Sequence, residues 1–142
     1  MILNDLLKIA GAMIYACEGT KARRDSRYEN HYIYSIELTN SRPEIIKIFA
    51  KFLRKVLIVK EERLRGQLFL YPDHNKEKLV KYWSLVSGIP ISQFQKVIML
   101  KQKNSKYKPN PLGTFKIRYN HKVDFFRLQV MITEVWKNAG VY

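Results

Sequence analysis

The sequence holds a single cysteine, Cys17, among its 142 residues. One thiol cannot form a disulfide within the chain, and it excludes a zinc site built from several cysteines. The three histidines, His31, His74 and His121, are scattered and lack the spacing of metal ligands. These shortages exclude disulfide scaffolds and multi-cysteine zinc modules, and they favour a reducing, intracellular location.

Long apolar runs are missing as well. No stretch approaches the roughly 20 apolar residues that a bilayer span requires, and no lysine-faced amphipathic segment stands apart from the rest. The sequence therefore predicts no membrane partner. Residues 1–5 also lack a basic segment followed by a cleavable apolar core, so we expect no secretory signal and a location in the cytoplasm, the nucleoid or an organelle matrix.

Acidic residues are scarce relative to basic ones. Twelve Asp and Glu stand against 26 Lys and Arg, which gives a net charge of +14 and a sequence pI near 9.9. Such an excess indicates a polyanionic partner, and nucleic acid is the better candidate because the features of membrane binding are missing. Hydrophobic residues (46%) and aromatic residues (13%) are frequent enough for a folded core. We expect one domain over residues 1–142.

Hydrophobic periodicity predicts an alternation of helices and strands. We expect helices at residues 4–18, 43–56 (with Ser41 as N-cap), 75–88 and 123–137, a hairpin at 20–30, and strands at 32–39, 63–71 and 114–120. Residues 92–100 fit a helical turn or a strand, and residues 101–111 read as an exposed basic loop. This order predicts a mixed α/β (α+β) fold with helices packed on one face of a sheet.

The other face of that sheet is expected to be open and basic. By strand alternation it collects Arg63, Arg65, Gln67, Lys116 and Arg118, with Lys21, Arg23, Arg24, Arg27, Lys103 and Lys106 around its rim. Antiparallel strands can follow a DNA groove, where arginine and glutamine read base edges and lysines meet phosphates. An ordinary wet sheet face is the alternative, but it would carry both signs of charge, so the bias favours DNA contact.

Small residues recur along the first predicted helix. Their spacing leaves one face without bulk, and we expect this face to pack against a second copy of the helix through Gly11, Ala12, Tyr15, Ala16 and Gly19. Glu18 lies in the last turn, against the helix dipole, and needs a positive group. A two-fold pair of helices would join two Glu18 carboxylates around Mg²⁺ or a similar cation. The same spacing also fits a helix packed on the chain's own core, with Glu18 in solvent.

The segment GAMIYACEGTK (residues 11–21) resembles the signature helix of the LAGLIDADG homing endonucleases, in the variant that ends Tyr-x-x-Glu-Gly. Residues 36–41 and 82–96 resemble later parts of that family, so the similarity covers residues 6–135. It implies a saddle-shaped sheet on DNA, a homodimer for a chain with one such helix, and cleavage of a long, nearly palindromic duplex site. The chain departs from the family in having Glu18 where Asp is commoner, directly after Cys17.

The resemblance also implies three site residues. Glu18 corresponds to the metal-binding acidic residue, and Asn40 to the polar residue that holds the attacking water. Lys96 corresponds to the basic residue that steadies the scissile phosphate, with Lys116 as a substitute. From the residues alone, Asn40 also fits a turn residue beside Ser41, and Lys96 an exposed strand lysine. The family also includes members that have lost cleavage, so a DNA-binding regulator or a maturase that holds intron RNA is the alternative function. A protein-interaction domain with incidental charge is a third.

Overall fold

The computed structural model describes residues 2–29, 31–101 and 110–142. The α-helices in these ranges are α1 (Ile2–Glu18), α2 (Pro43–Phe52), α3 (Lys76–Ser87) and α4 (Lys122–Asn138). The strands are β1 (Arg23–Arg24), β2 (Tyr32–Ile33), β3 (Ser35–Asn40), β4 (Leu64–Leu70), β5 (Ile98–Met99) and β6 (Thr114–Asn120). Shorter helical segments are η1 (Leu53–Leu57), η2 (Glu61–Arg63) and η3 (Ile91–Gln93). The chain is therefore a mixed α+β protein.

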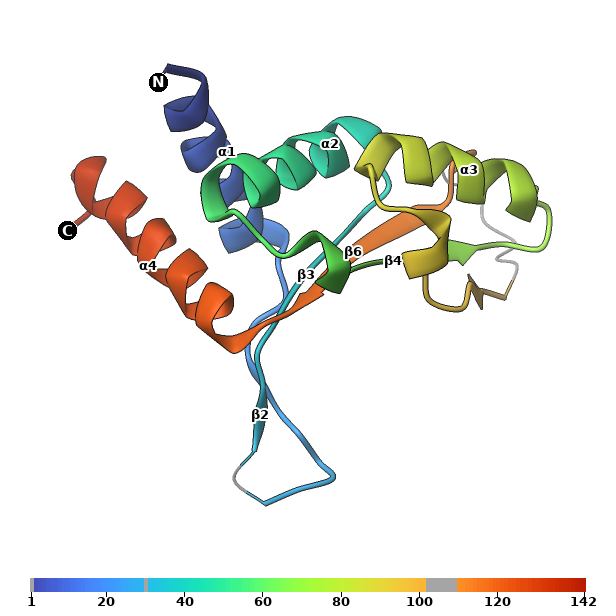
Figure 1. Ribbon diagram of the computed structural model, residues 1–142, viewed down its shortest axis with the longest axis horizontal. Coiled ribbons are helices and arrows are strands. Elements are labelled where there is room, and N and C mark those ends of the chain that lie inside the picture. The colour runs from blue at the N-terminus through green and yellow to red at the C-terminus, as the bar shows by residue number, and fades with distance from the viewer. Residues whose placement is uncertain (1, 30, 102–109) are drawn as a thin grey trace.

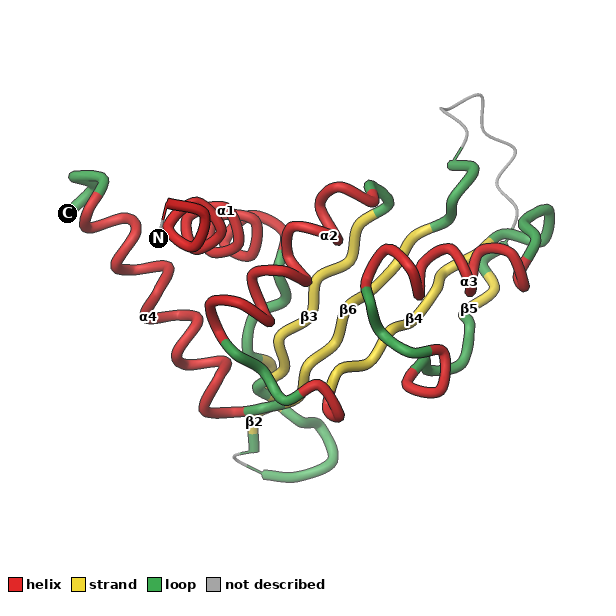
Figure 2. The backbone as a smooth tube through the Cα atoms, turned by 45° about the horizontal axis from the view of Figure 1, so that its top comes forward, coloured by secondary structure: helices red, strands yellow, loops and turns green. Residues whose placement is uncertain are grey.

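Four strands form the main sheet in the order β3-β6-β4-β5 (Figure 2). Strand β6 pairs antiparallel with both β3 and β4, and β5 pairs parallel with β4. In this register Arg118 of β6 lies opposite Glu37 on one side and Arg65 on the other. The short ribbon β1–β2 projects beyond the end of the sheet (Figure 1).

One face of the sheet is covered by helices. Helices α2 and α3 lie over the strands on the same side (Figure 2), and the strand residues that point toward them are buried: Ile36, Leu38, Leu64, Leu68, Phe115, Ile117 and Tyr119. Trp83 of α3 stacks on Phe115 with ring centroids 5.2 Å apart. This one-sided core confirms the predicted layering, because burial along β4 and β6 alternates with period two.

Helix α1 packs on the chain's own core. A Cβ on Gly11 would lie 2.1 Å from Cγ of Phe52, so the small residue is required by that ring. Ala12 and Tyr15 are also buried inside the same chain. The prediction that Gly11, Ala12 and Tyr15 form a dimer interface is therefore wrong, because their neighbours are intramolecular.

Gly19 is small for an internal reason too. A Cβ there would lie 2.3 Å from Cδ2 of Tyr15. A glycine directly after a helix often takes the left-handed conformation, but the φ angle of Gly19 is not positive, and the residue instead forms a β-bridge with Leu38. Ala16, the remaining one of the five predicted interface residues, is half-buried and also packs against the core of its own chain.

Several predicted boundaries change in the structure. Arg42, not Ser41, is the N-cap of α2, while Pro43 opens the helix as expected. The α-helical pairing ends at Phe52, and the predicted helical residues beyond it form the π-helical segment η1. Residues 92–100 contain both predicted alternatives, since the end of η3 is followed by β5. The basic loop, with Lys103 and Lys106, lies mostly outside the described residues.

Candidate nucleic-acid interface

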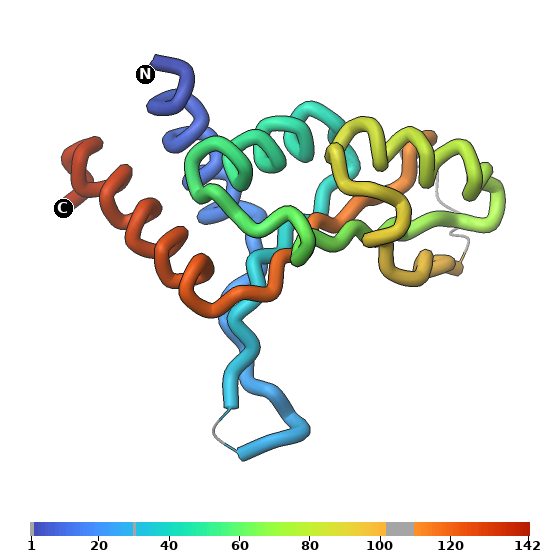
Figure 3. Tube along the Cα trace, in the orientation of Figure 1, coloured from blue at the N-terminus to red at the C-terminus, as the bar shows by residue number. Residues whose placement is uncertain are grey.

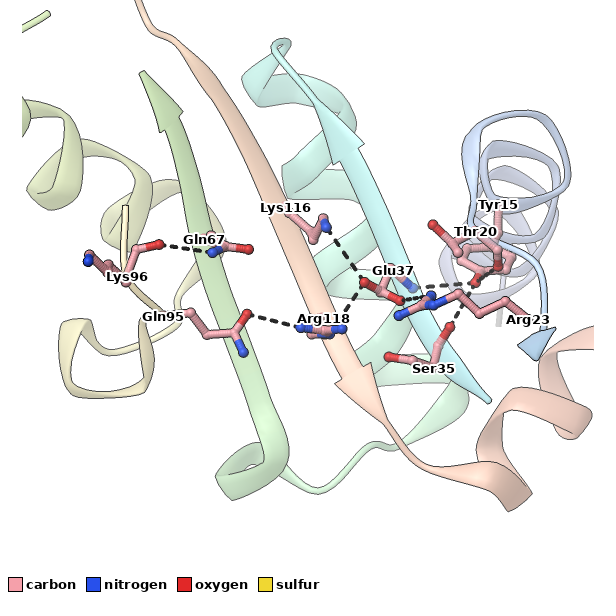
Figure 4. A network of polar contacts seen from close by, with 10 residues as sticks. All are labelled: Tyr15, Thr20, Arg23, Ser35, Glu37, Gln67, Gln95, Lys96, Lys116 and Arg118. Carbon is pink, nitrogen blue, oxygen red and sulfur yellow. Dashed lines mark hydrogen bonds and ion pairs between the residues drawn. The ribbon is translucent and has the colours of Figure 1, made fainter. Parts of the chain in front are cut away.

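A buried carboxylate lies on the open sheet face, on the edge strand β3. Glu37 of β3 is only 2% exposed, and its oxygens lie 2.7 Å from Nη1 of Arg23, 3.3 Å from Nε of Arg118 and 3.6 Å from Nζ of Lys116 (Figure 4). Arg118 is its direct cross-strand partner on β6, and Lys116 lies one alternation away on the same strand. Three strands therefore bring their charges to one point.

This ion cluster has a clear physical logic. A carboxylate removed from water is costly unless it is paired, and three cations compensate for that cost here. The surplus charge of the four side chains is two positive units, so the cluster is still basic. Arg118 is also held by Oε1 of Gln95 at 3.5 Å. The cationic side chains are therefore held in fixed positions on the sheet face and are not conformationally free in solvent.

The remaining predicted face residues also lie on this side of β4. Arg65 donates two hydrogen bonds of 2.8 Å to backbone carbonyls at the start of the strand. Gln67 donates to the carbonyl oxygen of Lys96 at 2.9 Å, and Arg63 lies in the exposed turn before β4. The structure thus brings together Arg63, Arg65, Gln67, Lys116 and Arg118 as expected; their contact with DNA stays a prediction.

The rim residues divide into three groups. Arg23 belongs to the Glu37 cluster rather than to the rim. Lys21 and Arg24 are exposed, and Arg27 pairs with Asp25 at 3.1 Å, where the guanidinium lowers the pKa of the carboxyl. Only the two rim residues of the 101–111 loop fall outside the described part of the chain.

Tyr15 fastens the end of α1 to the edge strand. Its hydroxyl donates to the carbonyl of Thr20 and accepts from the backbone N–H of Glu37 at 3.3 Å. The N–H of Thr20 in turn donates to the carbonyl of Glu37 at 2.9 Å. Burial raises the pKa of Tyr15 to about 12, so the phenol is the neutral donor at every ordinary pH. Glu18, just before this junction, is therefore fixed at the β3 edge, where it is exposed.

The three predicted catalytic residues do not gather within one chain. Asn40 accepts the N–H of Arg42 at 2.8 Å, so its side chain takes the turn role that the sequence left open. Lys96 lies beyond β4, and crossing from β3 to that side spans roughly three strand spacings, about 14 Å. Within a single chain, Glu18, Asn40 and Lys96 thus do not come together as one catalytic group, because Asn40 and Lys96 lie near opposite edges of the sheet.

Metal ligands are sparse in the described residues. These residues contain no group of three or more His, Cys, Asp or Glu side chains that could hold an ion. His74 and His121 serve internal contacts, to Tyr71 N–H at 2.9 Å and Asp124 N–H at 3.1 Å. Glu18 supplies one carboxylate per chain. Mg²⁺ keeps several waters and takes one or two carboxylates, so the binding of this ion by Glu18 stays a prediction.

Sequence reasoning missed Glu37 and the Tyr15 junction. The signal for Glu37 was its position on the polar side of a strand, since it is the single acidic residue in 31–40. A lone carboxylate on a sheet face that is otherwise basic must pair with its cross-strand neighbours. What was missing was the strand order, because β3 and β6 are separated by more than 70 residues in the sequence.

Comparison of the chain with protein-family models, with curated proteins and with solved structures finds no match in any of the three. The fold and the site therefore define the class by themselves: an α+β protein with a one-sided helical layer and an open basic sheet face. In the described ranges, every helix is too short or too polar to cross a membrane.

Proposed function

We propose that this chain binds duplex DNA on the open face of its sheet as a homodimer, and cleaves it as a LAGLIDADG-type, Mg²⁺-dependent endonuclease. The observation that carries the proposal is the uncovered sheet face itself, on which Arg23, Arg118 and Lys116 are anchored by Glu37. Prearranged cations lose little conformational entropy when they meet a polyanion.

The chemistry of the face suits base reading as well as phosphate contact. Arginine can bond to the O6 and N7 atoms of guanine with two parallel hydrogen bonds, which requires a fixed guanidinium plane. Arg118 is fixed in this way by Glu37 and Gln95. Antiparallel strands of this kind fit the major groove, where alternate residues reach the base edges. Exposed Lys21 and Arg24 suit phosphates at the rim.

The dimer in this proposal uses a different side of α1 from the one the sequence suggested. The stripe Ile2, Leu6, Ile9, Met13 and Ala16 follows helical spacing, and its first three members are 52–81% exposed. Contact of two such stripes around a two-fold axis, with the crossing near the C-terminal turn, would bring the C-terminal ends of the two α1 helices, each carrying an exposed Glu18, close to each other. The cation held there would neutralise phosphate charge and lower the pKa of a bound water.

A second candidate is a DNA-binding regulator without cleavage. The placement of Asn40 as a turn residue and of Lys96 across the sheet favours it, since neither stands ready to assist a water at Glu18. A maturase would use the same face for intron RNA. Both alternatives retain the basic surface and dispense with the metal.

Incubation of the purified protein with a plasmid library and Mg²⁺ tests the proposal. We expect linear products from a small subset of plasmids, and we expect Glu18→Ala to abolish cutting while duplex binding at low salt persists. Glu77→Ala, an exposed glutamate on α3, is the matched control and should cut normally. Cutting that persists in Glu18→Ala rejects the metal role; binding without cutting selects the regulator; absence of duplex binding rejects both.

A further inference from the structure

A hollow lies between the β1–β2 ribbon and the adjoining end of the main sheet. Its volume is about 660 Å³, and its lining includes Tyr32 and Tyr34 from the ribbon side and Arg63, Arg65 and Asn120 from the sheet side. Small-molecule sites in proteins occupy about 300–1,000 Å³, so the hollow can hold one nucleotide-sized group. Figure 3 shows the ribbon projecting from the end of the sheet.

The charge of the lining favours an anion. Five cationic side chains line the hollow against one carboxylate, and that carboxylate, Asp25, is already paired with Arg27. Arg63, Arg65 and Lys122 have no carboxylate within ion-pair distance in the part of the chain that the structure describes. These three cations are available to a phosphate.

Aromatic rings form another part of the lining. Tyr34 is packed against Phe126 with centroids 4.9 Å apart, and Nζ of Lys122 lies 5.3 Å from its ring centre. Tyr32 lies beside Tyr34, with centroids 6.3 Å apart, and is 56% exposed. A rigid tyrosine thus supports a second one whose ring is accessible, which is the arrangement of a stacking platform for a base.

Polar amides complete the lining. Asn120 is exposed, and Gln95, which accepts a hydrogen bond from Arg118, also lines the hollow. Side-chain amides both donate and accept hydrogen bonds, so they can pair with the edge of a base. The hollow therefore offers cations for the phosphate of a nucleotide, aromatic rings for the face of its base, and amides for the edge of its base. A phosphodiester group alone would use neither the rings nor most of the volume, and a base stacked inside a duplex cannot offer its face.

We propose that this hollow holds one unpaired nucleotide, swung out of the DNA that lies on the sheet face. Arg63, Arg65 and Lys122 bind its phosphate, Tyr32 stacks on its base, and Asn120 reads the base edge. The inference rests on the proposed DNA binding and adds to it a preference for a site with a displaced or bulged nucleotide, where the cost of unstacking is already met.

Anisotropy titrations with two duplexes of equal length test the inference, one perfect and one with a single bulged nucleotide. We expect the bulged duplex to bind about tenfold more tightly, in line with the energy of one base stacked on an aromatic ring. A 2-aminopurine at the bulge should lose fluorescence on binding. Tyr32→Ala should remove both effects and leave affinity for the perfect duplex unchanged, while Tyr32→Phe should retain them.

Tyr28→Ala is the matched control, because Tyr28 is also 56% exposed and belongs to the same hairpin, but does not line the hollow. Equal affinity of the native protein for the two duplexes overturns the inference and leaves duplex binding intact. Equal weakening of both duplexes by Tyr32→Ala also overturns it. Failure to bind either duplex rejects the proposed function itself and the nucleotide site with it.

Discussion

At the scale of single residues, Glu37 has the largest influence on the open face. It is an acid on the edge strand of a sheet face that we propose for a polyanion, so its charge opposes the ligand. Its role is to restrain three cationic side chains, because its carboxylate oxygens lie 2.7–3.6 Å from side-chain nitrogens of Arg23, Lys116 and Arg118. Free cations bind any phosphate, whereas fixed ones favour a duplex whose base edges and backbone match their positions.

Glu37→Gln should therefore lower the selectivity of the protein for particular DNA sequences and raise its affinity for DNA of any sequence. The substitution keeps the shape, removes one negative charge and frees three cations. We expect tighter binding to random duplex DNA, a plot of log affinity against log salt that is steeper by about 1, and less enrichment of any one sequence from a random library. Loss of the charged hydrogen bonds should lower the free energy of unfolding by about 1–3 kcal/mol.

The control for this charge change is Glu134→Gln. Glu134 is exposed on α4 and pairs with Lys8 at 2.9 Å, away from the sheet. The substitution Glu134→Gln removes the same charge and one ion pair, but away from the sheet face. It should therefore leave the salt dependence of DNA binding and the library enrichment nearly unchanged. Weaker binding with a shallower salt dependence in Glu37→Gln would contradict the restraining role and make the carboxylate itself part of the contact.

At the scale of elements, the contact between α1 and α2 is decided by one glycine. Gly11→Ala should destabilise the folded chain by about 1–3 kcal/mol, since the new Cβ overlaps Phe52. The gain of about 1 kcal/mol that alanine brings to a helix interior offsets only part of a cost near the upper end of this range, which the overlap with a ring atom favours. Denaturant unfolding of the single variants and of Gly11→Ala/Phe52→Leu measures the coupling: the double variant should lose less than the sum of the singles. A stable Gly11→Ala chain with an altered oligomeric state would return Gly11 to a dimer contact.

Strand β6 and helix α1 together show how much of the structure could be predicted from the sequence. Periodicity predicted β6 at 114–120 with its buried and open sides, because a strand needs only local alternation. Small-residue spacing predicted a close contact for α1, but it defines a face and not the neighbour that covers it. The neighbour proved to be Phe52 of the same chain. Likewise, the partners of Glu37 depend on strand order, which long-range packing sets and local pattern does not contain.

At the scale of the whole molecule, α1 and α4 extend away from the sheet with both chain ends on the same side (Figure 1). The outward stripe of α1 is apolar, and its N-terminal part is not covered by the residues that the structure describes, with Leu6 at 61% and Ile9 at 52% exposed. Burial of such side chains contributes about 1.5–3 kcal/mol each. A second copy with the same stripe can cover them through a two-fold contact, and this would also join two basic faces into one longer surface.

Leu6→Asp should therefore separate the dimer. We expect the native protein to sediment at twice the chain mass and the variant at the chain mass, because a carboxylate placed within the contact must be desolvated without a partner. The matched control is Leu85→Asp on α3, where Leu85 is 85% exposed on a different side, and this variant should stay dimeric. The monomeric variant should also show about half the salt dependence of DNA binding, since it contacts half as many phosphates. A native chain that is monomeric both alone and with duplex DNA would refute the homodimer, and loss of the dimer in Leu85→Asp instead would move the contact to α3.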